Sequence, residues 1–135
     1  MRITSKEGKD YIYDIIRKKE VVLTPEEWVR QQIIHYLINK KNYPPSLFSI
    51  EKQIKIGTLK KRYDIVAYKN EAPWLIIECK AETEPLNTHT IQQILSYNSQ
   101  LKASYLALTN GKEIKIYDVR LKKWETEFPD YLIKV

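Results

Sequence analysis

The middle of the chain reads as a strand, a helix and a second strand in direct succession. Residues 73–80 (PWLIIECK) and 104–111 (SYLALTNG) are short apolar runs of strand length. Residues 87–101 lie between them and place four apolar side chains on one helical face: Ile91, Ile94, Leu95 and Leu101. A strand–helix–strand step implies a parallel crossover. The sequence therefore predicts an α/β domain with a mixed sheet.

Clear helix signals precede this core. Thr24 suits the N-cap of a helix, Pro25 suits its first turn, and Glu27 completes a capping box with Thr24. The Pro-Pro pair at 44–45 stops the segment. The pattern predicts a helix over residues 25–41, with an apolar stripe formed by Val29, Ile33, Tyr36 and Leu37.

The remaining apolar runs read as strands separated by turn residues. They are expected at residues 47–57, 61–69 and 112–119, with an edge strand at 123–128. The turns are expected at Gly57-Thr58, at residues 70–73 and at Asn110-Gly111. The predicted core order is α-β-β-β-α-β-β, within a domain spanning residues 24–135. Residues 1–23 are expected to be a partly extended N-terminal extension, with disorder confined to about the first ten residues.

Composition excludes several classes of protein. The 135 residues fit one domain, and the single cysteine, Cys79, rules out an internal disulfide and a thiolate zinc site. His35 and His89 lie far apart, so a histidine metal site is not expected either. The sequence lacks a signal-peptide core and any apolar run near the roughly 18 residues of a membrane span. These features predict a cytoplasmic protein that does not contact a membrane.

The charge balance is basic, and one segment concentrates it. The formal net charge is +6, which is compatible with a polyanionic partner. Residues 55–62 carry four cations and no acid: Lys55, Lys60, Lys61 and Arg62. The segment is either a nucleic-acid contact or a solvated hairpin loop.

The strand before the second helix ends in two opposite charges. Glu78 and Lys80 lie two positions apart, so they share one face of that strand. Asp64 lies in the apolar run of the preceding strand. Simple pairing across the intervening turn places Asp64 opposite Cys79. A bulge or a one-residue shift instead brings it beside Glu78 or Lys80.

Two interpretations of these charges remain open from spacing alone. Two carboxylates that converge at the end of a sheet repel each other unless a cation lies between them. Carboxylate oxygens suit Mg²⁺ or Mn²⁺, and a nearby lysine can hold or deprotonate an attacking water. The alternative is a plain ion pair of Lys80 with Glu78 or Asp64.

Five blocks of the sequence resemble a known superfamily. The arrangement of Asp64 followed by Glu78-Cys79-Lys80 is similar to that of PD-(D/E)XK nucleases. More narrowly, residues 24–119 resemble the N-terminal nuclease domain of type I restriction enzyme R subunits and small stand-alone relatives. The blocks that carry this resemblance are PEEWVRQ, KRYDIVAY, WLIIECKA, QQILSYN and LTNGKEIKIYD. The resemblance implies a restriction-endonuclease-like fold, with a mixed central sheet flanked by two helices.

The resemblance assigns roles to individual residues. Asp64 and Glu78 match the metal-binding carboxylates, and Lys80 matches the catalytic lysine. Gln93 and Tyr97 match a QxxxY signature found in a subset of these nucleases, and they lie four positions apart on the second helix. Tyr63 stands where the superfamily's name has proline, a position that varies among relatives.

An acidic residue early in the first helix is a third candidate metal ligand. Glu26 matches it better than Glu27, because Glu26 is expected near the Val29–Ile33–Leu37 face while Glu27 serves as a cap. The alternative role for Glu26 is simple complementarity to the helix dipole.

The resemblance implies a nuclease that uses Mg²⁺ or Mn²⁺ and acts on DNA. The basic segment is then expected to contact the phosphate backbone. The chain has no G-x-x-x-x-G-K-[ST] loop, so a helicase or translocase, like a specificity subunit, is expected to be a separate polypeptide. A homodimer is also left open. The rival function is a non-catalytic nucleic-acid-binding or assembly module that keeps the nuclease fold.

Overall fold

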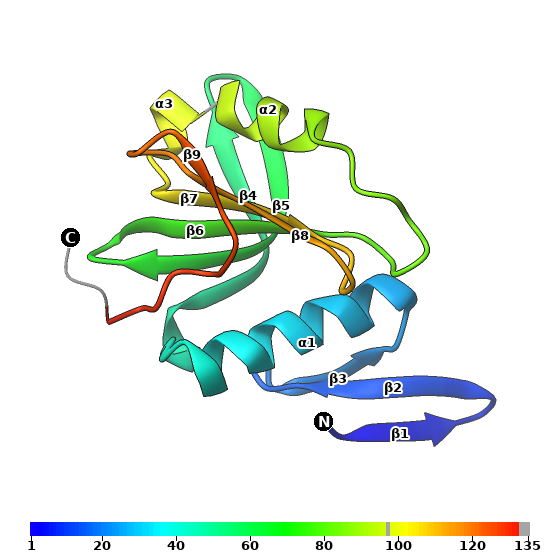
Figure 1. The fold of residues 1–135 in the computed structure, drawn as a ribbon. Coiled ribbons are helices and arrows are strands. Elements are labelled where there is room, and N and C mark those ends of the chain that lie inside the picture. The colour runs from blue at the N-terminus through cyan, green and yellow to red at the C-terminus, as the bar shows by residue number, and fades with distance from the viewer. Residues whose placement is uncertain (97, 133–135) are drawn as a thin grey trace.

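A six-stranded sheet forms the centre of the protein (Figure 1). The computed structural model describes residues 1–96 and 98–132. The strands follow the order β4-β5-β6-β7-β8-β9, in which β6 and β7 are parallel and all other neighbours are antiparallel. The predicted α/β class with a mixed sheet is confirmed. The strands are β4 (Phe48–Ile56), β5 (Leu59–Lys69), β6 (Ala72–Cys79), β7 (Tyr105–Thr109), β8 (Ile114–Asp118) and β9 (Lys123–Glu125).

Helices cover both faces of this sheet, as expected. Helix α1 (Pro25–Lys40) packs Val29 and Leu37 against one face, together with Ile65 and Ile77 of the sheet. Helices α2 (His89–Ser96) and α3 (Asn98–Leu101) cover the other face, where Ile91 and Ile94 meet Val66 and Ile76. A short 3-10 turn, η1 (Pro45–Leu47), joins α1 to β4. No helix within the described ranges is long and apolar enough to cross a membrane.

The N-terminal segment forms a small sheet of its own. Strands β1 (Ile3–Lys6), β2 (Lys9–Asp14) and β3 (Lys19–Val22) pair antiparallel in that order. Figure 1 shows α1 lying between this sheet and the six-stranded sheet. Strand β1 begins at Ile3, so the first ten residues, for which the sequence left disorder open, take part in this sheet. The reason is long-range packing, since Ile12 is fully buried and Ile15 and Ile16 pack against the α1 core.

Because α1 lies between two sheets, it buries more than one stripe. Ile34, Arg30 and Gln31 are buried in addition to most of the predicted stripe, whereas Tyr36 is exposed. Thr24 Oγ1 accepts a hydrogen bond from the Glu27 amide at 3.0 Å, as predicted for an N-cap. The second half of the predicted capping box is wrong, because the Glu27 carboxylate binds Arg17 and Gln31 in the interior.

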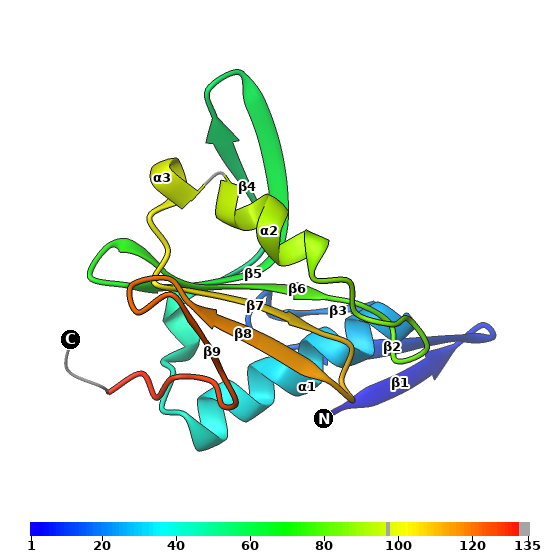
Figure 2. The ribbon, with the colours of Figure 1, turned by 45° about the horizontal axis from the view of Figure 1, so that its top comes forward.

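The β4–β5 ribbon stands out from the body of the sheet (Figure 2). Its tip is the predicted Gly57-Thr58 turn, where Gly57 takes the left-handed backbone conformation at φ +62°. At its base the strand pairing skips one position, from Ile50–Ile65 to Lys52–Tyr63. Ile65 packs on the α1 side of the sheet and Tyr63 on the α2 side, so the ribbon twists sharply at Asp64.

Candidate active site

The register of β5 and β6 brings two carboxylates together. Ile65 pairs with Ile77 and Ala67 with Leu75, while a bulge between Ala67 and Tyr68 shifts the rest of the hairpin. Extended by one residue beyond the Ile65–Ile77 pair, this register sets Asp64 across from Glu78. The bulge therefore decides between the pairings that the sequence left open, and Cys79 is not the residue opposite Asp64.

Two backbone amides hold the carboxylates in place. The Asp64 amide donates to Glu78 Oε1 at 3.1 Å, and the Cys79 amide donates to Asp64 Oδ2 at 2.7 Å. The Asp64 amide can point towards Glu78 because the skipped position at the ribbon base releases it from pairing with β4. Glu51, the residue of β4 at this position, has a positive φ of 53°. The skipped pairing at the ribbon base thus leaves the Asp64 amide available to hold the Glu78 carboxylate.

The electrostatics of Glu78 are those of a crowded acid. Burial, and next to it the negative charge of Asp64, raise the pKa of Glu78 to about 8, while Lys80 opposes this rise. Near neutral pH, and without a cation, Glu78 therefore favours its protonated form. A positive ion between the two carboxylates would remove this penalty.

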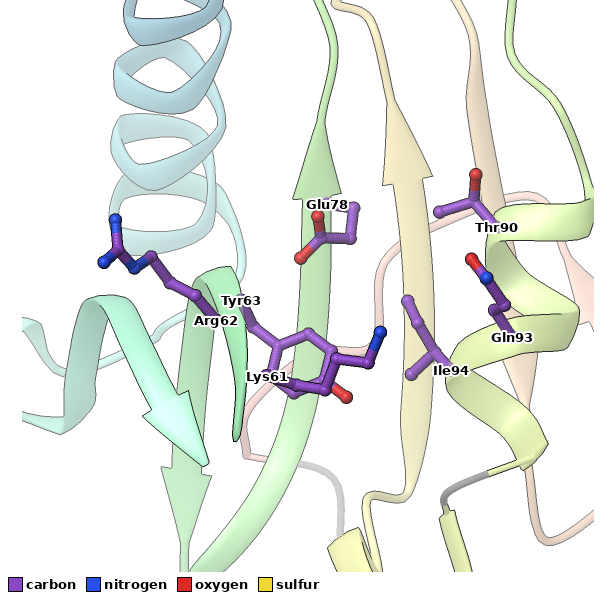
Figure 3. A pocket seen from close by; sticks show the side chains of 7 residues that line it. All are labelled: Lys61, Arg62, Tyr63, Glu78, Thr90, Gln93 and Ile94. Atoms are coloured by element: carbon purple, nitrogen blue, oxygen red, sulfur yellow. The ribbon is translucent and has the colours of Figure 1, made fainter. Parts of the chain in front are cut away.

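A small cavity opens beside Glu78. Its volume is about 130 Å³. Figure 3 shows ribbon residues on one side of Glu78 and α2 residues on the other, with the Lys61 ammonium pointing towards α2 and the Arg62 guanidinium pointing away from it. The lining residues are Lys61, Arg62, Tyr63, Glu78, Thr90, Gln93 and Ile94. The structure therefore brings Gln93 to the same cavity as Glu78.

The predicted lysine lies just beyond β6. The Lys80 amide donates to the carbonyl of Thr109 at 2.8 Å, which ties this position to the end of β7. The positive charge of Lys80 partly offsets the rise in the pKa of Glu78. Cys79, between them, is buried, and burial raises the pKa of its thiol well above the usual range. Tyr97, the partner of Gln93 in the predicted signature, lies outside the described residues.

The two acids at the start of α1 are oriented opposite to expectation. Glu26 is exposed, and Glu27 is buried. Arg17 and Gln31 draw the Glu27 carboxylate inwards, with contacts of 2.8 and 3.0 Å. Glu27 is also connected to Asp64, because Arg30 contacts both. Local sequence signals cannot predict this choice, since it depends on Arg17 between strands β2 and β3.

The four predicted DNA-contacting cations do not form one patch. Lys55 pairs with Lys60, and Arg62 pairs with Gln53, so these side chains share one face of the ribbon. Lys61 pairs with Ile54 on the opposite face, which turns towards α2. Lys55, Lys60 and Arg62 are exposed, while Lys61 is partly buried in the cavity wall.

The donor set fits a hard divalent cation held by two carboxylates. Within residues 1–96 and 98–132, no three His, Cys, Asp or Glu side chains gather as a metal cluster. Asp64 and Glu78 offer carboxylate oxygens side by side, and Mg²⁺ commonly binds one or two carboxylates while keeping several waters. The raised pKa of Glu78 is the cost that such an ion would offset.

Solved structures share this fold. A fragment of a protein proposed to be an HsdR subunit of a type I restriction enzyme, from Vibrio vulnificus, has a TM-score of 0.58 at 22% identity and covers 79% of this chain and 24% of that chain. A protein from Anabaena variabilis, proposed to be a nuclease belonging to DUF820, has a TM-score of 0.53 at 16% identity and covers 98% of this chain and 84% of that one. This chain thus spans about a quarter of the length of the HsdR fragment.

A family match agrees with the predicted resemblance. No curated protein matches the sequence. Residues 25–132 match the family described as the type I restriction enzyme R protein N terminus (HSDR_N). The match covers most of the chain and includes Asp64, Glu78 and Lys80, in a fold consistent with PD-(D/E)XK nucleases. The chain therefore belongs to the family of type I restriction enzyme R protein N-terminal domains.

Proposed function

We propose that this domain is a metal-dependent nuclease that hydrolyses phosphodiester bonds in DNA. The observation that carries the proposal is the Asp64–Glu78 pair, in which two carboxylates are held together by amides at a cost to Glu78. Membership of a restriction enzyme family, and a solved relative proposed to be a nuclease, support the same chemistry.

Asp64 and Glu78 would hold Mg²⁺ or Mn²⁺. When bound, the ion would stabilise the negative charge that develops on the phosphate and on the leaving oxygen. Asp64 is suited to this because the Cys79 amide fixes one of its oxygens. Glu26 is a candidate for a third ligand, but a weaker one than Asp64 or Glu78, since it is exposed at the start of α1.

Lys80 and the α2 residues would act on the attacking water. Lys80 lies two residues after Glu78, and its side chain can hold a water beside the carboxylates as an ammonium, or take a proton from that water as a neutral amine. Gln93 lines the same cavity and can orient that water or a phosphate oxygen through its amide. We assign Tyr97 to the same group on the sequence signature alone.

The exposed cations of the β4–β5 ribbon would bind the phosphate backbone of the substrate. Lys55, Lys60 and Arg62 form its open cationic face, and Lys61 reaches the cavity itself. Contacts of this kind position a nucleic acid without reading its sequence. A separate motor or specificity subunit, or a second copy of this chain, would then select where the domain cuts.

The first prediction separates a metal site from a structural ion pair. Mn²⁺ should raise the melting temperature of the parent protein, because it binds the folded state preferentially. Asp64→Asn and Glu78→Gln should each abolish this shift and the cleavage of DNA. Lys80→Ala should keep the shift while cleavage falls by about two orders of magnitude or more, as for the loss of a general acid–base group. Differential scanning calorimetry and a plasmid-nicking assay measure both effects.

Glu71→Gln serves as the matched control for these variants, because Glu71 lies in the exposed turn between β5 and β6. It removes an exposed carboxylate and should change the Mn²⁺ shift little. A melting temperature of the parent that does not change when divalent metal is added would contradict the nuclease assignment. DNA binding without cleavage in any metal would then favour the non-catalytic module.

The second prediction concerns stability without metal. The pKa of Glu78 is raised to about 8 in the folded protein, above the ordinary value of 4.5, so the folded state binds its proton more tightly than the unfolded state. The stability that this proton contributes is fully present below about pH 4.5 and is lost as the pH rises through about 8. The melting temperature in EDTA should therefore fall from pH 5.5 to pH 8.5, and Glu78→Gln should flatten that fall. An equally steep fall in Glu78→Gln would show that another group causes it.

The third prediction concerns the salt dependence of DNA binding. Neutralising Lys55, Lys60 and Arg62 should make the slope of log affinity against log salt shallower, by about 0.9 for each lost phosphate contact. Fluorescence anisotropy with two DNA duplexes of different sequence should give the same change for both. The control removes as much charge from other exposed positions: Lys9, Lys18 and Lys122. If the control flattens the slope as much as the ribbon variant, the ribbon is not the binding surface.

A further inference from the structure

A chain of buried and half-buried charges runs from the N-terminal sheet to Asp64. Arg17 lies between β2 and β3, and its Nη2 lies 2.8 Å from Glu27 Oε1. Its Nε contacts Asp14, a fully buried acid at the end of β2. Its Nη1 lies 3.9 Å from Glu51 Oε2. Arg17 thus joins the small sheet to both α1 and the base of the β4–β5 ribbon.

Arg30 on α1 makes the next link. Its side chain is only 7% exposed and lies among three carboxylates. Nη2 lies 3.5 Å from Asp64 Oδ1, while Nη1 lies 3.4 Å from Glu51 Oε1 and 3.7 Å from Glu27 Oε1. Nε and Nη1 are buried and have no hydrogen-bond partner among the described residues. A buried guanidinium with unused donors is costly, so its position depends on the charges around it.

The distances suggest how the two arginines depend on each other. Arg17 Nη2 lies 2.8 Å from Glu27 Oε1, whereas the contacts of Arg30 with its three acids are between 3.4 and 3.7 Å long. Without Arg17, the Glu27 and Glu51 carboxylates would be free to pair closely with Arg30. Arg30 would then be drawn away from Asp64, which it contacts at 3.5 Å.

We infer that Arg17 and Arg30 are positioning residues for Asp64, so that the N-terminal sheet is part of the machinery of the active site. Arg30 acts on Asp64 Oδ1 directly, while the Cys79 amide fixes Oδ2. Arg17 acts through Glu27 and Glu51. The inference rests on the proposed function, and it extends the site beyond the family match, which begins at residue 25. The competing explanation is an ion cluster that only stabilises the fold.

The first test needs no metal. Asp64→Asn should lower the urea unfolding midpoint of the parent more, or raise it less, than it does that of Arg17→Met, because relief of the repulsion with Glu78 is common to both backgrounds while the Arg30–Asp64 pair is lost only from the parent. Lys6→Met is the matched control, since it breaks a 2.8 Å ion pair with Glu20 in the same sheet. In that background Asp64→Asn should have its full effect. Equal effects of Asp64→Asn in all three backgrounds would overturn the inference.

The second test measures Mn²⁺ affinity by titration calorimetry on the folded, full chain. Arg30→Met, Arg30→Lys and Arg17→Met should each weaken binding about tenfold, the lower end of the range for residues that orient metal ligands. Lys6→Met should bind Mn²⁺ like the parent. Arg30→Lys separates geometry from charge, because lysine keeps the charge but cannot span three carboxylates. Tighter binding by Arg30→Met, with Arg30→Lys unchanged, would reduce Arg30 to a repelling charge and contradict the positioning role.

The two tests also separate this inference from the proposed function. A parent protein that binds no Mn²⁺ would contradict the nuclease proposal, while the metal-free test would still decide whether Arg17 acts on Asp64. If Arg30→Met fails to fold, Arg17→Met carries the test, because the Arg17 side chain is 22% exposed and that of Arg30 only 7%.

Discussion

The repulsion between Asp64 and Glu78 is the interaction on which the rest of the site depends. A folded chain gains nothing from bringing two carboxylates together at the edge of a core, and the raised pKa of Glu78 measures that cost. Several features of the fold hold the two carboxylates together against this repulsion. The bulge in the β5–β6 hairpin sets the register, and the twist of the β4–β5 ribbon frees the Asp64 amide for Glu78. Such concentrated strain is common where a protein binds an ion or a substrate.

The layers of the protein explain why this geometry is stable. The parallel β6–β7 pair anchors the strand that carries Glu78 and Lys80, and helices shield both faces of the sheet. The N-terminal sheet closes over the outer side of α1 and brings Arg17 to the acids beside Asp64. Substrate and ion are expected on the α2 side, where the cavity lies. The supporting charges therefore approach from one side of the sheet, and the proposed chemistry would take place on the other.

The sequence predicted what local signals determine. Thr24, Pro25 and the Pro-Pro pair at 44–45 predicted the bounds of α1, and turn residues such as Gly57 predicted the hairpins. Features set by long-range packing could not be predicted from the local sequence. The bulge beside Tyr68 changes the pairing by one residue, which periodicity cannot detect. The burial of Glu27 in place of Glu26 depends on Arg17, and the order of the first ten residues depends on Ile12.

Proton release on metal binding tests the central claim most directly. If Asp64 and Glu78 share a divalent ion, the proton held by Glu78 at neutral pH must leave when the ion binds. Calorimetric titration of the parent protein with Mn²⁺ at pH 7, in two buffers of different ionisation enthalpy, counts that proton. The account predicts one ion bound per chain and the release of about one proton per ion, with the release falling at higher pH. Absence of binding, or binding with no proton released, would contradict it.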